Sequence, residues 1–410
     1  MKRDWNDRLQ AGERIDPDEP GELLDVVGGE PPAEAAEAVG ERTGALLPWR
    51  TLGEWCELDG DWLDVAPPPR SWLLTDPYGE GGQANVLSRG VVGIFASAGG
   101  VGKTFALLEL AALVASGGHQ KDHNRLWLDR LAADGGRVLF IAGEETADEL
   151  RRRLHAVVRR FLKPDPAGTR DADRTRWHPG LKQKIRDRLV VVPTAGVPDL
   201  ALLTLEPGRN LRPSARHAEI VDKLREGPEP WDLVILDPMV RFAAGEIDRD
   251  NMAASALIGS FEAFIAAGAR PGHPGPAVLV AHHTSKQARR DGPSQDTSAD
   301  VRGASAITDN ARWCATLGPH PDKEAVVVFT VSKSNYGGKP CFSLARDESG
   351  LLRLLTRKES ADLDAAIKAA KDAARDARLE DSLDASDAKA RKKEERRAAG
   401  VDAASRQAPR

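Results

Sequence analysis

Short apolar runs separated by helical or mixed segments recur along the middle of the chain. Five of them are rich in β-branched residues: 91–95, 137–142, 189–193, 233–237 and 277–281. Such runs are typical of strands whose two faces are both covered by helices, as in a parallel sheet. The clearest intervening helices are 103–117 and 146–162, and Thr146 with Glu149 forms a predicted capping box for the second. The pattern predicts an α/β core with a mostly parallel sheet.

The hydrophobic pattern changes after Trp313. Apolar residues recur within segments 324–338, 341–347 and 351–355, and a Glu-Ser-Gly turn joins the last two segments. We expect these segments to form antiparallel hairpins that close one edge of the sheet. The α/β domain would then span residues 91–356.

The two ends of the chain differ in composition from this core. Residues 1–44 hold 12 acidic and 5 basic side chains, in a chain of net charge −5, and we expect a disordered acidic tail. Residues 45–90 hold four of the nine tryptophans and form a predicted arm that packs on the core or a neighbouring subunit. A base-stacking platform is the alternative for this arm. Residues 357–410 predict a charged tail that is helical or disordered.

Composition excludes several classes of protein. No apolar run in the 410 residues approaches the roughly 20 that a membrane span needs. The N-terminus also lacks the apolar stretch of a secretory signal. Cys56, Cys314 and Cys341 are far apart and form no C-x-x-C pair. We therefore expect a cytoplasmic protein without a membrane partner.

The strand predicted at 91–95 leads into the sequence ASAGGVGKT, which nearly matches a phosphate-binding loop. The pattern is G-x-x-x-x-G-K-[ST], and Ser97 replaces its first glycine. Backbone N–H groups and the following helix bind the phosphates in such a loop, so a serine is acceptable where its backbone suits an L-residue. The predicted ATP contacts are Ser97, Ala98, Gly99, Gly100, Val101, Gly102, Lys103 and Thr104. A structural glycine-rich turn is the alternative.

Carboxylates follow two predicted strands at the sheet edge where this loop would lie. Asp237 ends the strand at 233–237 and would position a Mg²⁺ ion that Thr104 also ligates. Glu144 and Glu145 follow the strand at 137–142, where a carboxylate can orient a water toward the γ-phosphate. We assign this role to Glu144, because Glu145 can cap the helix that follows.

Two histidines, His282 and His283, end the fifth predicted strand. Adjacent strand residues point to opposite faces, so the pair is not expected to share a metal ion. We expect one ring to pack against the core and the other, at the strand tip, to sense the bound phosphate.

Together these motifs resemble those of RepA-type plasmid replicative helicases, which are RecA-fold hexameric ATPases. The resemblance covers about residues 88–355, and "HHTSK", "DNARW" and "VSKSNYG" are more specific to that family than the nucleotide motifs are. It implies a RecA-like P-loop fold, a ring-shaped homo-oligomer expected to be a hexamer, and ATP hydrolysis coupled to single-stranded DNA. The N-terminal arm, the charged tail and an insertion at 163–184 depart from the family.

The resemblance also implies roles for individual residues. Glu144 would be the catalytic base and Asp237 the Walker B acid. His283 would couple the γ-phosphate to a DNA-binding loop. Arg312 would be an arginine finger that reaches the ATP of the neighbouring subunit, and Lys333 would enter that same site. Without the family, Arg312 would be assigned to a surface salt bridge.

Two polar loops, 238–251 and 285–303, are the expected DNA contacts. Flexible loops with spaced Arg and Lys side chains can follow a phosphate backbone without recognising its sequence. The predicted DNA-binding residues are Arg241, Lys286, Arg289, Arg290 and Arg302. Ordinary solvated loops are the alternative.

The favoured function is therefore an ATP- and Mg²⁺-dependent hexameric DNA helicase or translocase that serves a plasmid, phage or mobile element. One alternative is a RecA-fold recombinase or mediator that binds DNA without unwinding it. Another is an ATP-dependent regulatory switch with a protein client and no DNA. Stimulation of ATP hydrolysis by single-stranded DNA distinguishes the first from the last.

Overall fold

The computed structural model divides into two compact units, residues 1–68 and 69–410. Within them it describes residues 50–59, 62–118, 126–160, 179–206, 210–244, 250–284, 305–320, 323–348, 350–369, 372 and 375. In the first unit, helix α3 spans Leu52–Asp59. The second unit contains the sheets and the other described helices.

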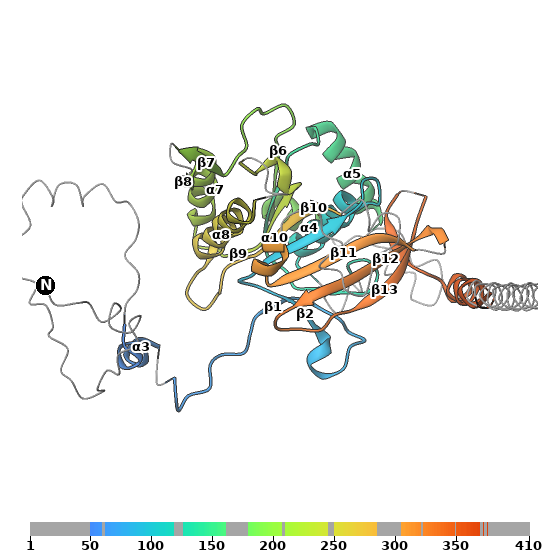
Figure 1. Ribbon diagram of the computed structural model, residues 1–410, viewed down its shortest axis with the longest axis horizontal. Coiled ribbons are helices and arrows are strands. Elements are labelled where there is room, and N and C mark those ends of the chain that lie inside the picture. The colour runs from blue at the N-terminus through green and yellow to red at the C-terminus, as the bar shows by residue number, and fades with distance from the viewer. Residues whose placement is uncertain are drawn as a thin grey trace, which may run out of the picture. The chain divides into compact units, whose positions relative to one another are not determined.

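A nine-stranded sheet forms the centre of the second unit (Figure 1). Its order is β14 (Leu352–Leu354), β13 (Cys341–Arg346), β12 (Lys323–Ser334), β11 (Trp313–His320), β3 (Val92–Ser97), β10 (Ala277–His283), β9 (Trp231–Asp237), β5 (Arg137–Ala142) and β6 (Leu189–Pro193). The strands from β11 to β6 are parallel, whereas β12, β13 and β14 form an antiparallel extension. The expected α/β fold class, with a mostly parallel sheet and an antiparallel C-terminal part, is confirmed.

Helices cover both faces of this sheet. Their bounds are α4 (Lys103–Ala115), α5 (Ala147–Arg160), α6 (Pro179–Arg188), α7 (Ala215–Arg225), α8 (Asn251–Gly268) and α10 (Ser305–Asn310). Phe95 packs in the core cluster that contains α4, whereas its neighbour Ile94 packs in the cluster that contains α7 and α8. Successive strand residues point to opposite faces, which explains why the strand sequences are apolar throughout.

Helix α8 is a core helix, although it has the length and composition of a membrane span. Its 18 residues are long and apolar enough to cross a membrane, which the sequence pattern had not indicated, and half of the helix is buried in the fold. Leu257 and Phe261 pack in the second core cluster. The Asp250 carboxylate caps the helix by accepting from the N–H groups of Met252 and Ala253. Its apolar surface is therefore accounted for by packing within the chain.

The start of α5 uses only half of the expected capping box. The Glu149 N–H donates to Thr146 Oγ1 at 3.3 Å, as predicted. The Glu149 carboxylate does not return to Thr146 but accepts from Arg153 and Arg152. These hydrogen bonds lower the pKa of Glu149, and the bond from Arg153 has the larger effect. Nearby arginines compete for the carboxylate that the capping box would have used.

Two smaller sheets also occur among the described residues of the second unit. One contains β1 (Trp72–Thr75), β2 (Asn85–Ser88) and β4 (Ala132–Ala133), and the other contains β7 (Leu203–Glu206) and β8 (Asn210–Pro213). Arg89 joins the first of these to the main sheet, because its Nε lies 2.7 Å from Asp232 Oδ1 and its Nη2 lies 2.9 Å from Asp134 Oδ2. Short 3₁₀ helices occur at Gly81–Ala84 and Met239–Arg241, and residues 357–369 are helical.

The parallel strands give the sheet two chemically different edges. One of them, which we call the loop edge, is formed by the carboxyl ends of the parallel strands, where Ser97, Ala142, Asp237 and His283 lie. Cross-strand pairing places Ala142 opposite Asp237 and His283 opposite Ser97. The strands begin at the other edge, which we call the entry edge, where Arg89 and Trp313 lie. The placement of each candidate residue follows from these two edges.

Candidate nucleotide-binding site

Residues 98–102 connect β3 to α4 at the loop edge. Gly100 and Gly102 have φ angles of +79° and +112°, a region that side-chain-bearing residues rarely adopt. A Cβ on Gly99 or Gly100 would meet no atom within 4 Å, so this part of the loop faces open space. Ser97 lies in the extended backbone of β3 and is fully buried. Replacement of the first glycine by serine therefore requires no strained backbone.

The other loop residues have structural contacts. The Ser97 hydroxyl donates to the Ala98 carbonyl at 3.0 Å. Val101 packs its side chain against the core cluster that contains α4. The Gly102 carbonyl accepts the first backbone hydrogen bond of α4, from Ala106. The loop is thus anchored at both ends and open in its middle.

Lys103, Thr104 and Asp237 converge beside this loop. Thr104 Oγ1 donates to Asp237 Oδ2 at 2.7 Å. Lys103 Nζ lies 3.5 Å from Asp237 Oδ1, and both side chains are more than nine-tenths buried. A buried ion pair at the start of a helix requires a specific tertiary arrangement, because each charge has lost most of its water. The structure therefore brings together the loop lysine, the loop threonine and the carboxylate that ends β9.

The same atoms fit a magnesium ion. Mg²⁺ prefers hard oxygen ligands and usually takes only one or two from the protein, with water and substrate phosphates supplying the others. Thr104 Oγ1 and Asp237 Oδ2 are oxygen donors within hydrogen-bonding distance of each other. Their chemistry and their position beside the phosphate loop suit that ion.

Glu144 and Glu145 have different surroundings at the end of β5. Glu145 forms an ion pair with Arg153 of α5 at 2.7 Å. Glu144 is exposed, and no hydrogen bond or ion pair joins its side chain to another described residue. The Gly143 N–H donates to the Asp237 carbonyl at 2.7 Å, which holds this turn against the end of β9. Of the two carboxylates, Glu144 is the one available beside Asp237.

The two histidines at the end of β10 are placed differently. His282 is almost fully buried, and its carbonyl accepts from Lys103 Nζ at 3.4 Å. His283 is half-buried and lies opposite Ser97 in the strand register. The N–H of Thr284 then donates to the Ser97 carbonyl at 3.1 Å. His283 thus lies at the loop edge, directly beside the strand that leads into the phosphate loop.

Among the predicted DNA-binding residues, the structure describes Arg241. Its Nε donates to the Gly143 carbonyl at 3.1 Å, and its Nη2 donates to the Val197 carbonyl at 3.0 Å. The side chain therefore fixes the turn that carries Glu144. Lys286, Arg289, Arg290 and Arg302 lie outside the described residues.

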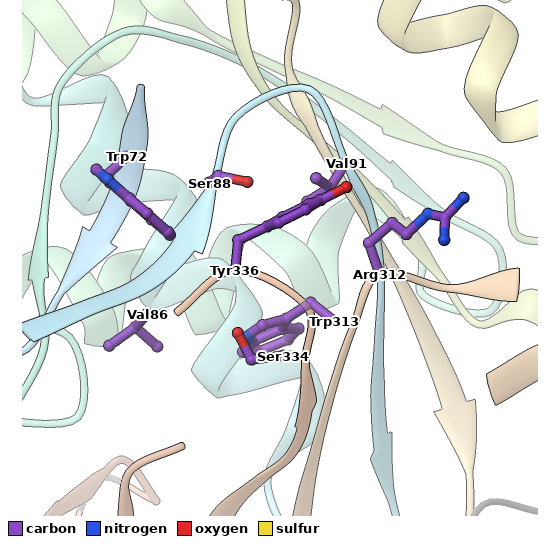
Figure 2. A pocket seen from close by; sticks show the side chains of 8 residues that line it. All are labelled: Trp72, Val86, Ser88, Val91, Arg312, Trp313, Ser334 and Tyr336. Carbon is purple, nitrogen blue, oxygen red and sulfur yellow. The ribbon is translucent and has the colours of Figure 1, made fainter. Parts of the chain in front are cut away.

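Arg312 and Lys333 lie at the entry edge. The Arg312 N–H donates to the Val92 carbonyl at 2.9 Å, and the Arg312 side chain is exposed. Figure 2 shows Arg312 beside Trp313 and Tyr336 at a small pocket. Lys333 Nζ donates to the carbonyls of Thr308 and Asp309, near the end of α10, each at 2.8 Å.

The predicted site residues therefore form two separate groups. The phosphate loop, Asp237, Glu144 and His283 lie at the loop edge, whereas Arg312 and Lys333 lie at the entry edge. The strand β3 separates them, and its path from Val92 to Ser97 is about 16 Å long at the usual rise of an extended strand. An arginine side chain is shorter than this, so Arg312 does not reach the phosphate loop of its own chain.

One loop contact, made by Arg346, was not predicted from the sequence. Arg346 ends β13, and its Nη2 donates to the carbonyls of Gly100 and Val101 at 2.8 and 2.7 Å. More than 240 residues separate these partners along the chain. No motif surrounds Arg346, and only the antiparallel extension of the sheet brings it to the loop edge.

This chain is similar to a protein family and to solved structures. A family model described as "AAA domain" matches residues 53–289, which is more than half of the chain. A solved structure titled "ATPase Domain of G40P" is similar over 79% of this chain and 97% of that chain, at 14% identity and a TM-score of 0.41. Another, titled "The Structure Of A DnaB-Like Replicative Helicase And Its Interactions With Primase", is similar over 65% of this chain and 58% of that chain, at 15% identity and a TM-score of 0.41.

Proposed function

Because the chain belongs to the AAA domain family, we propose that it hydrolyses ATP and uses the energy to move along or unwind single-stranded DNA. The family match includes the phosphate loop, Glu144, Asp237 and His283, and it ends before Arg312. The convergence of Lys103, Thr104 and Asp237 carries the nucleotide part of this proposal. In the resemblance to RepA-type helicases, the context is replication of a plasmid, phage or mobile element in the cytoplasm.

The loop edge supplies the groups that ATP hydrolysis needs. Backbone N–H groups of the loop and the charge of Lys103 would hold the β- and γ-phosphates. A Mg²⁺ ion held by Thr104 and Asp237 would neutralise charge on those phosphates. The Glu144 carboxylate would orient the attacking water and accept its proton. His283, beside the loop strand, is positioned to respond to whether the γ-phosphate is present.

The position of Arg312 supports action between subunits. An exposed arginine at the entry edge cannot serve the site at the loop edge of the same chain. A second copy could present its Arg312 to that site, and the positive charge would stabilise the transferring phosphate. The resemblance assigned Lys333 to the neighbour's ATP site. Because its amine donates to two α10 carbonyls of its own chain, we propose instead that Lys333 holds α10 and the segment that leads to Arg312. We propose a ring of identical subunits, with six as the expected number.

The DNA part of the proposal is supported by the position of the basic segment 285–304 in the sequence, between Thr284 and α10. It starts one residue after Thr284, whose N–H donates to Ser97 at the phosphate loop, and it leads into α10. This segment contains Lys286, Arg289, Arg290 and Arg302. The basic segment therefore follows directly in sequence from a residue that is hydrogen-bonded to the strand leading into the phosphate loop.

Single-stranded DNA is expected to raise the rate of ATP hydrolysis. The measurement is phosphate release with and without an oligonucleotide, at low and moderate salt, because contacts to DNA phosphates weaken as salt increases. Arg289→Ala combined with Arg290→Ala should reduce the stimulation. Arg186→Ala combined with Arg188→Ala removes the same charge from α6 and should not reduce it.

Two outcomes would redirect the proposal. If DNA neither binds nor stimulates, the DNA function is wrong and the regulatory switch with a protein client becomes the better interpretation. If DNA stimulates hydrolysis but a forked duplex is not separated, the protein is a DNA-binding recombinase or mediator rather than a helicase.

Glu144→Gln should bind ATP normally and hydrolyse it about 100-fold more slowly or worse, because an amide cannot accept the proton of the attacking water. Glu145→Gln is the matched control, since it loses only the ion pair with Arg153 and should hydrolyse ATP at nearly the normal rate. ATP binding is measured by calorimetry and turnover by phosphate release. The opposite result, with Glu145→Gln inactive and Glu144→Gln active, would assign the base to the neighbouring residue.

A further inference from the structure

The guanidinium of Arg346 contacts the phosphate loop from the antiparallel extension of the sheet. Its Nη2 lies 2.8 Å from the Gly100 oxygen and 2.7 Å from the Val101 oxygen. A Cβ on Gly102 would lie 3.6 Å from the same Nη2 and 3.8 Å from Leu352, so the arginine packs closely along the loop. One side chain thus binds two consecutive carbonyls of the loop.

These two hydrogen bonds orient two peptide planes. The peptide units that follow Gly100 and Val101 are trans, so each C=O points opposite to the N–H of the next residue. Holding the two carbonyls toward Arg346 therefore directs the N–H groups of Val101 and Gly102 away from it. Neither N–H group donates to another described residue. They are available for an anion on the other side of the loop.

We propose that Arg346 is a positioning residue for phosphate binding, which acts by holding the N–H groups of Val101 and Gly102 toward the phosphates. This inference rests on the proposed ATP binding. The loop's glycines permit many backbone conformations, and fixing one of them before binding reduces the entropy lost when the phosphates arrive. Arg346 therefore acts on the loop backbone, not on the nucleotide.

This position also connects the loop to the strand that carries Lys333. Arg346 ends β13, which pairs with β12, and Lys333 lies near the far end of β12. The antiparallel extension thus bears on the phosphate loop at one edge and on α10 at the other. A role in positioning the loop explains the hydrogen bonds between this exposed arginine and the carbonyls of a glycine-rich turn that is distant in sequence.

The test compares two ligands that share only the phosphate chain. Dissociation constants of ATP and of inorganic tripolyphosphate, both with Mg²⁺, are measured by calorimetry for the full-length protein, Arg346→Ala and Arg346→Lys. Arg346→Ala should weaken both ligands by a similar factor, about tenfold, which is the effect of roughly one net hydrogen bond. Arg346→Lys keeps a charged donor and should show a smaller loss for both.

Arg353→Ala is the matched control. Arg353 lies on the adjacent strand β14 and pairs with Glu359, so its loss removes the same charge from the extension without touching the loop. It should leave both dissociation constants unchanged, and thermal unfolding of all variants checks the fold. Should Arg346→Ala not fold, Arg346→Lys tests the inference by itself. Weaker binding of both ligands by a similar factor would support it, and normal binding of both would overturn it.

Three results would overturn the inference. Weaker binding of ATP with normal binding of tripolyphosphate would mean that Arg346 contacts the nucleoside itself. Normal binding of both ligands by Arg346→Ala would mean that the loop needs no support, and the proposed ATPase would stand without it. Failure of the unaltered protein to bind either ligand would instead overturn the proposed function, and the role of Arg346 with it.

Discussion

Lys103→Ala should show no measurable ATP hydrolysis. Lys103 Nζ is buried between the Asp237 carboxylate and the His282 carbonyl, at 3.5 and 3.4 Å, so it is fixed beside the loop before any ligand arrives. Its removal takes away the charge that would contact the β- and γ-phosphates, and no other lysine or arginine among the described residues pairs with Asp237. Phosphate release measured over a range of ATP concentrations separates lost affinity from lost turnover.

Two further variants make this result interpretable. Removing one partner of a buried ion pair is often destabilising, so Lys103→Ala is compared with Lys103→Met, which keeps the apolar stem. Lys339→Ala removes an exposed lysine and should be fully active. Normal hydrolysis by either folded Lys103 variant would mean that ATP is not held by this loop, and the proposed function would fail.

Arg312→Ala should bind ATP almost normally and hydrolyse it about 10³-fold more slowly, the size of effect seen for arginine fingers. The reason is geometric, since Arg312 lies at the entry edge and its backbone N–H is fixed to the Val92 carbonyl. Binding should survive because every group that holds the nucleotide in its own chain remains. Calorimetry gives the affinity, and phosphate release gives the rate.

Mixing variants tests whether Arg312 acts between subunits. Arg312→Ala subunits retain an intact phosphate loop, and Lys103→Ala subunits retain an intact Arg312, so mixed assemblies should regain activity that neither variant shows alone. Mixing Arg312→Ala with a subunit that carries both substitutions is the control and should restore nothing. Subunit exchange is verified by energy transfer between labelled copies. No recovery in verified mixed assemblies would assign Arg312 to a role within its own chain.

Local patterns were sufficient for the parts of the fold that local sequence controls. Each of the five apolar runs coincides with a strand, namely β3, β5, β6, β9 and β10, except that Val91 precedes β3 by one residue. A strand buried on both faces needs an uninterrupted apolar sequence, although β6 is only half-buried. The phosphate loop and Asp237 were predicted for a related reason: ligand sites of parallel sheets gather where the strands end. Their convergence follows from the sheet alone.

Other features depended on tertiary pairing that no local pattern reveals. The strand β11 contains Gly318 and Pro319 and was not predicted, yet it is buried between β3 and β12. Arg346 and Lys333 bind backbone carbonyls. Every residue has a backbone carbonyl, so the residue type of the partner does not indicate such a contact. Arg241 was predicted to meet DNA from its charge, whereas its hydrogen bonds to Gly143 and Val197 depend on how the loops fold together.

The two edges of the sheet have a consequence for assembly. If a site is completed by the Arg312 of another copy, each subunit offers two unlike surfaces, and copies must join head to tail. An open row of such subunits always leaves one terminal phosphate loop without a finger, and a closed ring leaves none. Activity per subunit should therefore rise as rings close, even though no contact within any one subunit has changed.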